Sequence, residues 1–162
     1  MKNNRSIKRR GFTLVELLIV IVVIGVLSAM MMLSSTEAVT SARASNIVSN
    51  LRNLKTAALS LYASSLDQLK GTDAKKPTIN SVKKYLNNEG NVDGYSVVCT
   101  NGTDGTNYDD GSSWYIAYHV TDDNVKPKLK ARATTLSLKG NDSEAAPSDP
   151  YTSQAYVFMQ VR

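Results

Sequence analysis

Few side chains in this sequence are placed to do chemistry, and the first of them is Glu16. It is the only charged residue between Phe12 and Leu33, and the other side chains of that run are almost all apolar. A carboxylate at membrane depth costs about 2.5 to 3.5 kcal/mol on insertion scales. Glu16 therefore requires either a cationic partner or a position near the lipid headgroups, where the cost falls.

The remaining candidates for catalysis are weak. His119 is the sole histidine, and it lies in the segment WYIAYHV, where strand alternation predicts a surface or edge position rather than a general base. Cys99 is the sole cysteine, so it cannot form an intramolecular disulfide, and we expect it to be buried and inert. No zinc-type Cys/His cluster, phosphate-binding glycine loop or nucleophile elbow is present. The sequence predicts a protein that is not an enzyme.

Three acids in a long turn could supply oxygen ligands to calcium: Asp104, Asp109 and Asp110. They lack the EF-hand spacing and its closing glutamate, and turns rich in Gly, Asp and Asn are usually only solvated. We therefore expect no cofactor and keep calcium at these three acids as the alternative.

The basic residues are concentrated at the start of the chain. Of the formal charge of +5, all comes from the first eleven residues, which contain five Lys or Arg and no acid. The remainder has fourteen basic and fourteen acidic residues. Cations just before an apolar span hold that end in the cytoplasm, so the rest of the chain should lie on the far side of the membrane. The neutral remainder also argues against nucleic-acid binding by the whole protein.

The segment GFTLVELL at residues 11–18, after Lys8-Arg9-Arg10, resembles the type IV prepilin signature. That signature is shared by type IV pilins, type II secretion pseudopilins and competence pilins. The resemblance implies that a prepilin peptidase cleaves between Gly11 and Phe12, that the new amine of Phe12 is methylated, and that the apolar segment stays on the mature protein. It also implies that Glu16 pairs with the Phe12 amine of a neighbouring subunit. Such a pair would relieve the cost of both charges and fix the axial register.

Residues 17–33 contain no charge over about 26 Å of helix, close to the thickness of a bilayer core. Gly25 and Ala29 form a small-xxx-small pair that permits close helix approach, although small residues are common in membrane helices. No proline lies near Leu33, where many pilins have one and where their helix is locally extended in filaments. The sequence therefore does not predict such an extended segment for this helix.

After Ser34 an apolar stripe continues at three- and four-residue steps and predicts one helix over residues 12–69. Its apolar half should face lipid or other helices, and its amphipathic half should pack on the domain that follows. A coiled coil is the alternative for the second half. The stripe comprises Val39, Ala42, Ile47, Leu51, Leu54, Ala58, Leu61 and Leu69.

The rest of the chain predicts a small α+β head. A linker at 70–77 leads to a short helix capped by Thr78 and ending near Leu86. Strands are predicted at 95–99, 114–120 and 155–161, with a polar loop at 141–153 before the last. A third helix should run from a cap at Asp123 or Asn124 to Leu138, followed by Gly140. We expect one basic face on it, formed by Lys126, Lys128, Lys130 and Arg132.

Three segments follow from this pattern: a cleaved leader at 1–11, a transmembrane and filament-core half-helix at 12–33, and a pilin-like head at 34–162 that includes the half-helix 34–69. The function predicted is a structural subunit of a type IV pilus. A type II secretion pseudopilin or a competence pilin is the alternative, and a membrane-tethered exported binding protein is the alternative of another class.

The expected partners are identical or related pilin subunits in a helical filament, the prepilin peptidase and methyltransferase, and an inner-membrane assembly platform. Nucleic acid is not expected, although Lys83, Lys84 and the third helix carry the charges that would suggest it. The precursor should span the cytoplasmic membrane once with its N-terminus in the cytoplasm, and the assembled protein should form an extracellular pilus or a periplasmic pseudopilus.

Overall fold

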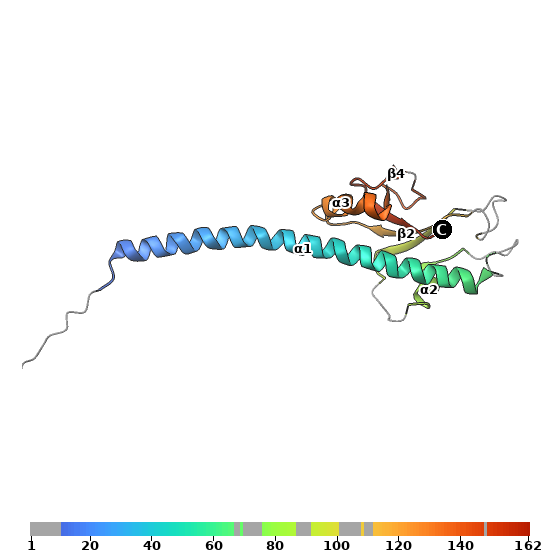
Figure 1. Cartoon of the computed structure of the whole chain (residues 1–162), viewed down its shortest axis with the longest axis horizontal. Coiled ribbons are helices and arrows are strands. Elements are labelled where there is room, and N and C mark those ends of the chain that lie inside the picture. Colours follow the sequence, from blue (N-terminus) through green and yellow to red (C-terminus); the bar gives the residue numbers. More distant parts are fainter. Residues whose placement is uncertain are drawn as a thin grey trace, which may run out of the picture. The chain divides into compact units, whose positions relative to one another are not determined.

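The computed structural model describes residues 11–66, 69, 76–86, 92–100, 108, 112–147 and 149–162 (Figure 1). The leader before Gly11, most of the predicted linker and the calcium candidates Asp104, Asp109 and Asp110 lie outside the described residues. By its internal contacts the chain divides into two units, Met1–Val39 and Thr40–Arg162.

Helix α1 spans Leu14–Ser64. It ends five residues before the predicted boundary at Leu69. The N–H of Ser65 still donates to the carbonyl oxygen of Leu61, but the N–H of Leu69 closes a tighter turn on Leu66. That turn keeps Leu69 buried in the core, and its carbonyl oxygen accepts from the N–H of Tyr108 at 3.0 Å.

The core-facing stripe of α1 begins one residue later than its apolar pattern predicts. Val39 is 49% exposed, whereas Thr40 is only 7% exposed. Ala42 is also exposed, and Ala44 is buried in its place. Counting from Thr40 in alternating steps of four and three gives an unbroken buried row, as a helix packed along one face requires. That row is Thr40, Ala44, Ile47, Leu51, Leu54, Ala58 and Leu61.

Five antiparallel strands form one sheet in the order β1-β2-β5-β3-β4. Alternation along the strands divides their side chains between two faces. On one face Val97, Ile116 and Met159 join the main core with the α1 row, and on the other Tyr115, Ala117 and Phe158 form a second cluster. The strands are β1 (Tyr95–Cys99), β2 (Trp114–His119), β3 (Lys139–Asn141), β4 (Asp149–Pro150) and β5 (Tyr156–Gln160).

The α+β pilin-like fold is therefore confirmed: the long N-terminal helix packs on an antiparallel sheet. Figure 1 shows the sheet and α3 beside the C-terminal part of α1. The three predicted strands are present, each within two residues of its predicted ends.

The polar loop predicted at 141–153 is wrong in part, because β3 and β4 were not foreseen. β3 contains Lys, Gly and Asn and has no apolar alternation, so its backbone pairing with β5 and β4 makes it a strand. Gly140 is not a helix stop but the centre of β3. A Cβ at Gly140 would lie 3.1 Å from the Cα of Tyr151, so the close approach of the two backbones requires glycine.

Helix α2 (Ile79–Lys83) begins as predicted, with the Thr78 hydroxyl accepting from the N–H of Ser81. Helix α3 (Lys126–Leu136) does not begin at the predicted cap. Its N-cap is Val125, without a side-chain bond, and Asp122 instead accepts from the N–H of Asn124 in the preceding turn. The helix ends at Leu136 because Ser137 takes a left-handed conformation with φ of 50°.

The single basic face predicted on α3 is also wrong. Residues two apart on an α-helix are separated by about 200°, so the four cations form two pairs on different flanks of the buried stripe. Lys126 bonds Asp123 at 2.7 Å on one flank, and Arg132 bonds the Ser45 hydroxyl of α1 at 2.8 Å on the other. Leu129 and Ala133 face the core between them.

Candidate functional site

The residues predicted to be processed lie in an open segment. Gly11 and Phe12 precede α1, and Phe12 is 87% exposed. A Cβ at Gly11 would meet nothing within 4 Å. No described residue therefore shields the peptide bond between Gly11 and Phe12.

Glu16 closes the first turn of α1 through Thr13. The Thr13 N–H donates to Glu16 Oε2 at 2.8 Å, and the Thr13 hydroxyl donates to the same oxygen at 2.9 Å. In return, the Glu16 N–H donates to the Thr13 hydroxyl oxygen at 3.2 Å. This is a capping box, in which a Thr at the N-cap and a Glu three residues later satisfy otherwise unpaired helix N–H groups. The T-x-x-E spacing at residues 13–16 was a signal for it that our sequence reasoning did not use.

The apolar residues that follow are uncovered within the first unit. Large side chains from Leu14 to Met32 are all about half or more exposed, including Leu27 at 53%. By its length and composition α1 is able to cross a membrane, and a signal sequence near an N-terminus can have the same length and composition. Gly25 and Ala29 lie in this stretch, both exposed, and a Cβ at Gly25 would meet nothing within 4 Å. None of the described residues of the first unit covers Gly25.

The candidates for catalysis do not form a site. His119 is exposed at the end of β2 and stacks on Tyr156 of β5, with 4.7 Å between ring centroids. Cys99 is half-buried, and burial raises the pKa of its thiol to about 12. In the part of the chain that the structure describes, no three His, Cys, Asp or Glu side chains gather to hold a metal ion.

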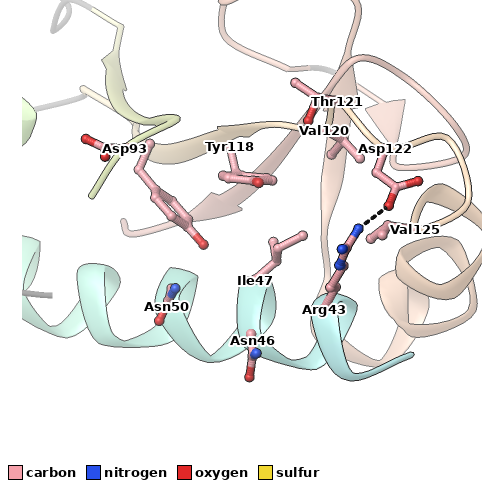
Figure 2. Close-up of a pocket in the computed structure, with 11 residues that line it drawn as sticks. Arg43, Asn46, Ile47, Asn50, Asp93, Tyr118, Val120, Thr121, Asp122 and Val125 are labelled. Atoms are coloured by element: carbon pink, nitrogen blue, oxygen red, sulfur yellow. Dashed lines mark hydrogen bonds and ion pairs between the residues drawn. The ribbon is translucent and has the colours of Figure 1, made fainter. Parts of the chain in front are cut away.

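The head also has a polar hollow of about 380 Å³ beside α1. Figure 2 shows Arg43 reaching from α1 to Asp122, with their charged atoms 2.8 Å apart. The N–H of Asn124, assisted by Arg43, lowers the pKa of Asp122. Deeper in the hollow, burial raises the pKa of Tyr95 to about 12, while a bond from Asn50 opposes this shift. None of the described residues lining the hollow is a histidine or cysteine.

Comparison with known proteins agrees with the geometry of the N-terminal segment. Residues 7–32 match the prokaryotic N-terminal methylation motif, which is typical of type IV pilins and pseudopilins. No curated protein and no solved structure matches the chain. The N-terminal segment of the protein is thus type IV pilin-like. The motif implies processing by a prepilin peptidase and assembly with pilin subunits, and the apolar helix that carries it indicates a membrane-inserted precursor.

Proposed function

We propose that this chain is a structural subunit of a type IV pilus. One observation carries the proposal: the methylation motif at residues 7–32 leads into a helix whose large apolar side chains are exposed among the described residues of its own unit. Exposed apolar surface of this extent requires lipid or other protein. A filament built from bundled N-terminal helices supplies the second environment after the membrane has supplied the first.

In this account residues 1–11 are a leader that is removed between Gly11 and Phe12, after which the Phe12 amine is methylated. Residues 12–33 span the inner membrane in the precursor, with the N-terminus in the cytoplasm, and pack in the filament core after extraction by an assembly platform. Residues 34–162 form the head on the filament surface. The basic leader and the length of the apolar run support this topology.

Glu16 has two roles in the proposal. It caps its own helix through Thr13, and it pairs with the cationic Phe12 amine of a neighbouring subunit. The two roles are compatible because a carboxylate has about four lone-pair sites on two oxygens, and both bonds from Thr13 go to Oε2. The pair between subunits would fix the axial register of the helices.

Three variants separate these roles. Glu16→Gln keeps an acceptor oxygen for Thr13 and removes only the charge, whereas Glu16→Ala removes both. We expect both variants to be cleaved and inserted normally and to reduce sheared filaments by about tenfold or more, equivalent to about 1.4 kcal/mol per contact. Glu37→Gln, an acid outside the apolar run, should assemble as the unmodified protein does. Normal filament yield from Glu16→Gln would disprove the charge pair while leaving the cap intact.

A pseudopilin remains the second candidate, because the matched motif is typical of both classes. Shearing whole cells distinguishes them. Recovery of this chain in long extracellular filaments supports a pilin, and its restriction to short periplasmic assemblies supports a pseudopilin or a competence pilin. A chain that stays monomeric in the membrane would instead support the tethered binding protein.

A further inference from the structure

Two adjoining hollows follow the side of the head where α1 and α3 lie together and where β5 ends. They have volumes of about 360 and 530 Å³ and share Arg52 of α1 and Thr135 and Leu136 of α3. The first extends toward Ser45 and Arg132, and the second extends past Lys55 to Arg162. We call the two together the cationic groove.

The charged side chains of this groove are all cations. They are Arg52, Lys55, Arg132 and Arg162, and none of the described residues lining either hollow is an acid. From Ser45 to Lys55 the groove follows α1 for about 15 Å. Like charges gathered along one surface attract a ligand with several negative charges.

Arg162 is the cation of the groove whose position is most closely defined by its neighbours. Its guanidinium stacks over the ring of Tyr62, 4.3 Å from the ring centroid. Its Nη1 atom is buried and has no hydrogen-bond partner among the described residues. Its main-chain oxygen accepts from the N–H of Trp114 at 3.3 Å. Because Nη1 is buried, a carboxylate that enters the groove would pair with the positive charge of the guanidinium rather than with this N–H.

The same chain carries a complementary surface. Residues 141–149, which we call the acidic segment, contain Asp142, Glu144 and Asp149 and no Lys or Arg. All three acids are exposed. Asp142 also accepts from the N–H of Ala155 at 3.1 Å, which anchors this acidic segment to the start of β5.

The acidic segment and the cationic groove lie at opposite ends of β5. Asn141, where the acidic segment begins, pairs with Tyr156 at the first end. Gln160 and Arg162 line the groove at the other end. The distance along β5 from Tyr156 to Gln160 is about 14 Å at roughly 3.4 Å per residue. Two complementary surfaces at different ends of one domain form a heterologous contact between copies, and repetition of such a contact gives an open helical filament.

We propose that the acidic segment of one subunit, carrying Asp142, Glu144 and Asp149, docks in the cationic groove of the next subunit along the filament. This inference rests on the proposed function and names the head surfaces that meet. The carboxylates would pair with the positive charges of Arg162, Arg52 and Lys55. The contact adds a polar interface between heads to the packing of the apolar helices.

Charge exchange tests the contact in the full-length protein. Arg52→Glu with Lys55→Glu lowers the side-chain charge of the groove from +4 to 0, and Ser143→Lys with Glu144→Lys raises that of the acidic segment from −3 to 0 without removing Asp142. Each double variant should reduce sheared filaments by about tenfold or more, since it removes the attraction between the surfaces and places like charges at the substituted positions. The four substitutions together should restore the yield to within about threefold, because the introduced acids and the introduced lysines attract each other. Lys83→Glu with Lys84→Glu makes the same charge change on α2 and should leave the yield unchanged.

The outcomes separate this inference from the proposed function. Filaments of the unmodified chain with normal yield from the groove variant would overturn the inference and leave the pilin assignment intact. Loss in both double variants without rescue by the combination would also overturn it. Retained filaments together with salt-sensitive binding of duplex DNA that the groove variant abolishes would assign the groove to nucleic acid instead. Absence of filaments from the unmodified chain would overturn the proposed function itself.

Discussion

The two parts of helix α1 have nearly opposite environments. From Leu14 to Met32 the large apolar side chains are exposed, whereas from Thr40 to Leu61 one row of side chains is buried against the sheet and α3. The first part is apolar on all its faces. The second part has a single apolar row, which is the row that packs in the core of the head. The apolar residues of one helix therefore lie in two different environments. Their burial within the chain distinguishes these two environments better than their hydropathy does.

The comparison also shows what each part needs from outside. The second part completes a core that about 90 further residues could not bury alone. The first part has its large apolar side chains exposed, and in the proposed function lipid or other copies cover them. Substitutions in the two parts should therefore separate folding from assembly.

The largest difference between the two parts is expected when the same leucine-to-alanine substitution is made in each of them. Leu51 is 0% exposed, so Leu51→Ala should lower the free energy of unfolding of the head by about 2 to 5 kcal/mol through lost contacts and a cavity. Leu27→Ala removes the same atoms from the exposed part and should leave the head unchanged within about 0.5 kcal/mol. Thermal unfolding of the full-length protein in detergent measures both. Equal destabilisation by the two variants would contradict the division.

A smaller effect should locate the boundary between the parts. Thr40 is buried and Val39 is half-exposed, although Val39 is the more apolar. Thr40→Ala should cost about 1 kcal/mol of head stability, and Val39→Ala should cost less than about 0.5 kcal/mol. The same unfolding experiment compares them. A larger loss from Val39→Ala would move the start of the core one residue toward the N-terminus.

The smallest effect concerns acid conditions and belongs to the head alone. The pKa of Asp122 is lowered in the folded state, so its contribution to stability is present above its unfolded pKa and is lost as pH falls through the folded value. Asp122→Asn keeps an acceptor for Asn124 and removes the charge beside Arg43. Its Tm should therefore fall less between pH 7 and pH 3 than that of the unmodified protein. An identical fall would show that Asp122 does not contribute.

Much of this architecture can be predicted from the sequence because its patterns are long or locally specified. The apolar run, the row from Ile47 to Leu61 and the strands rich in β-branched and aromatic residues each repeat a period that packing enforces. The Thr78 cap depends only on the Thr78 hydroxyl and on the N–H of Ser81, three residues later. The motif beginning near Gly11 is equally local, and the family comparison matched it without any structure.

The features that were missed depend on distant parts of the chain. β3 becomes a strand because β5 and β4 pair with its backbone and because Gly140 fits against Tyr151. The end of α3 depends on Ser137 adopting a positive φ, for which serine carries little signal. The cationic groove joins Arg52, Arg132 and Arg162, which are separated by up to 110 positions in sequence. No linear pattern brings these three residues together.

Reconstruction of filaments sheared from cells by electron cryomicroscopy tests the central claim most directly. We predict filaments in which this chain begins at a methylated Phe12, residues 12–33 bundle at the axis with Glu16 beside a neighbouring Phe12 amine, and the heads lie outside. Filaments that lack this chain, or that contain it with residues 12–33 outside the core, would contradict the account.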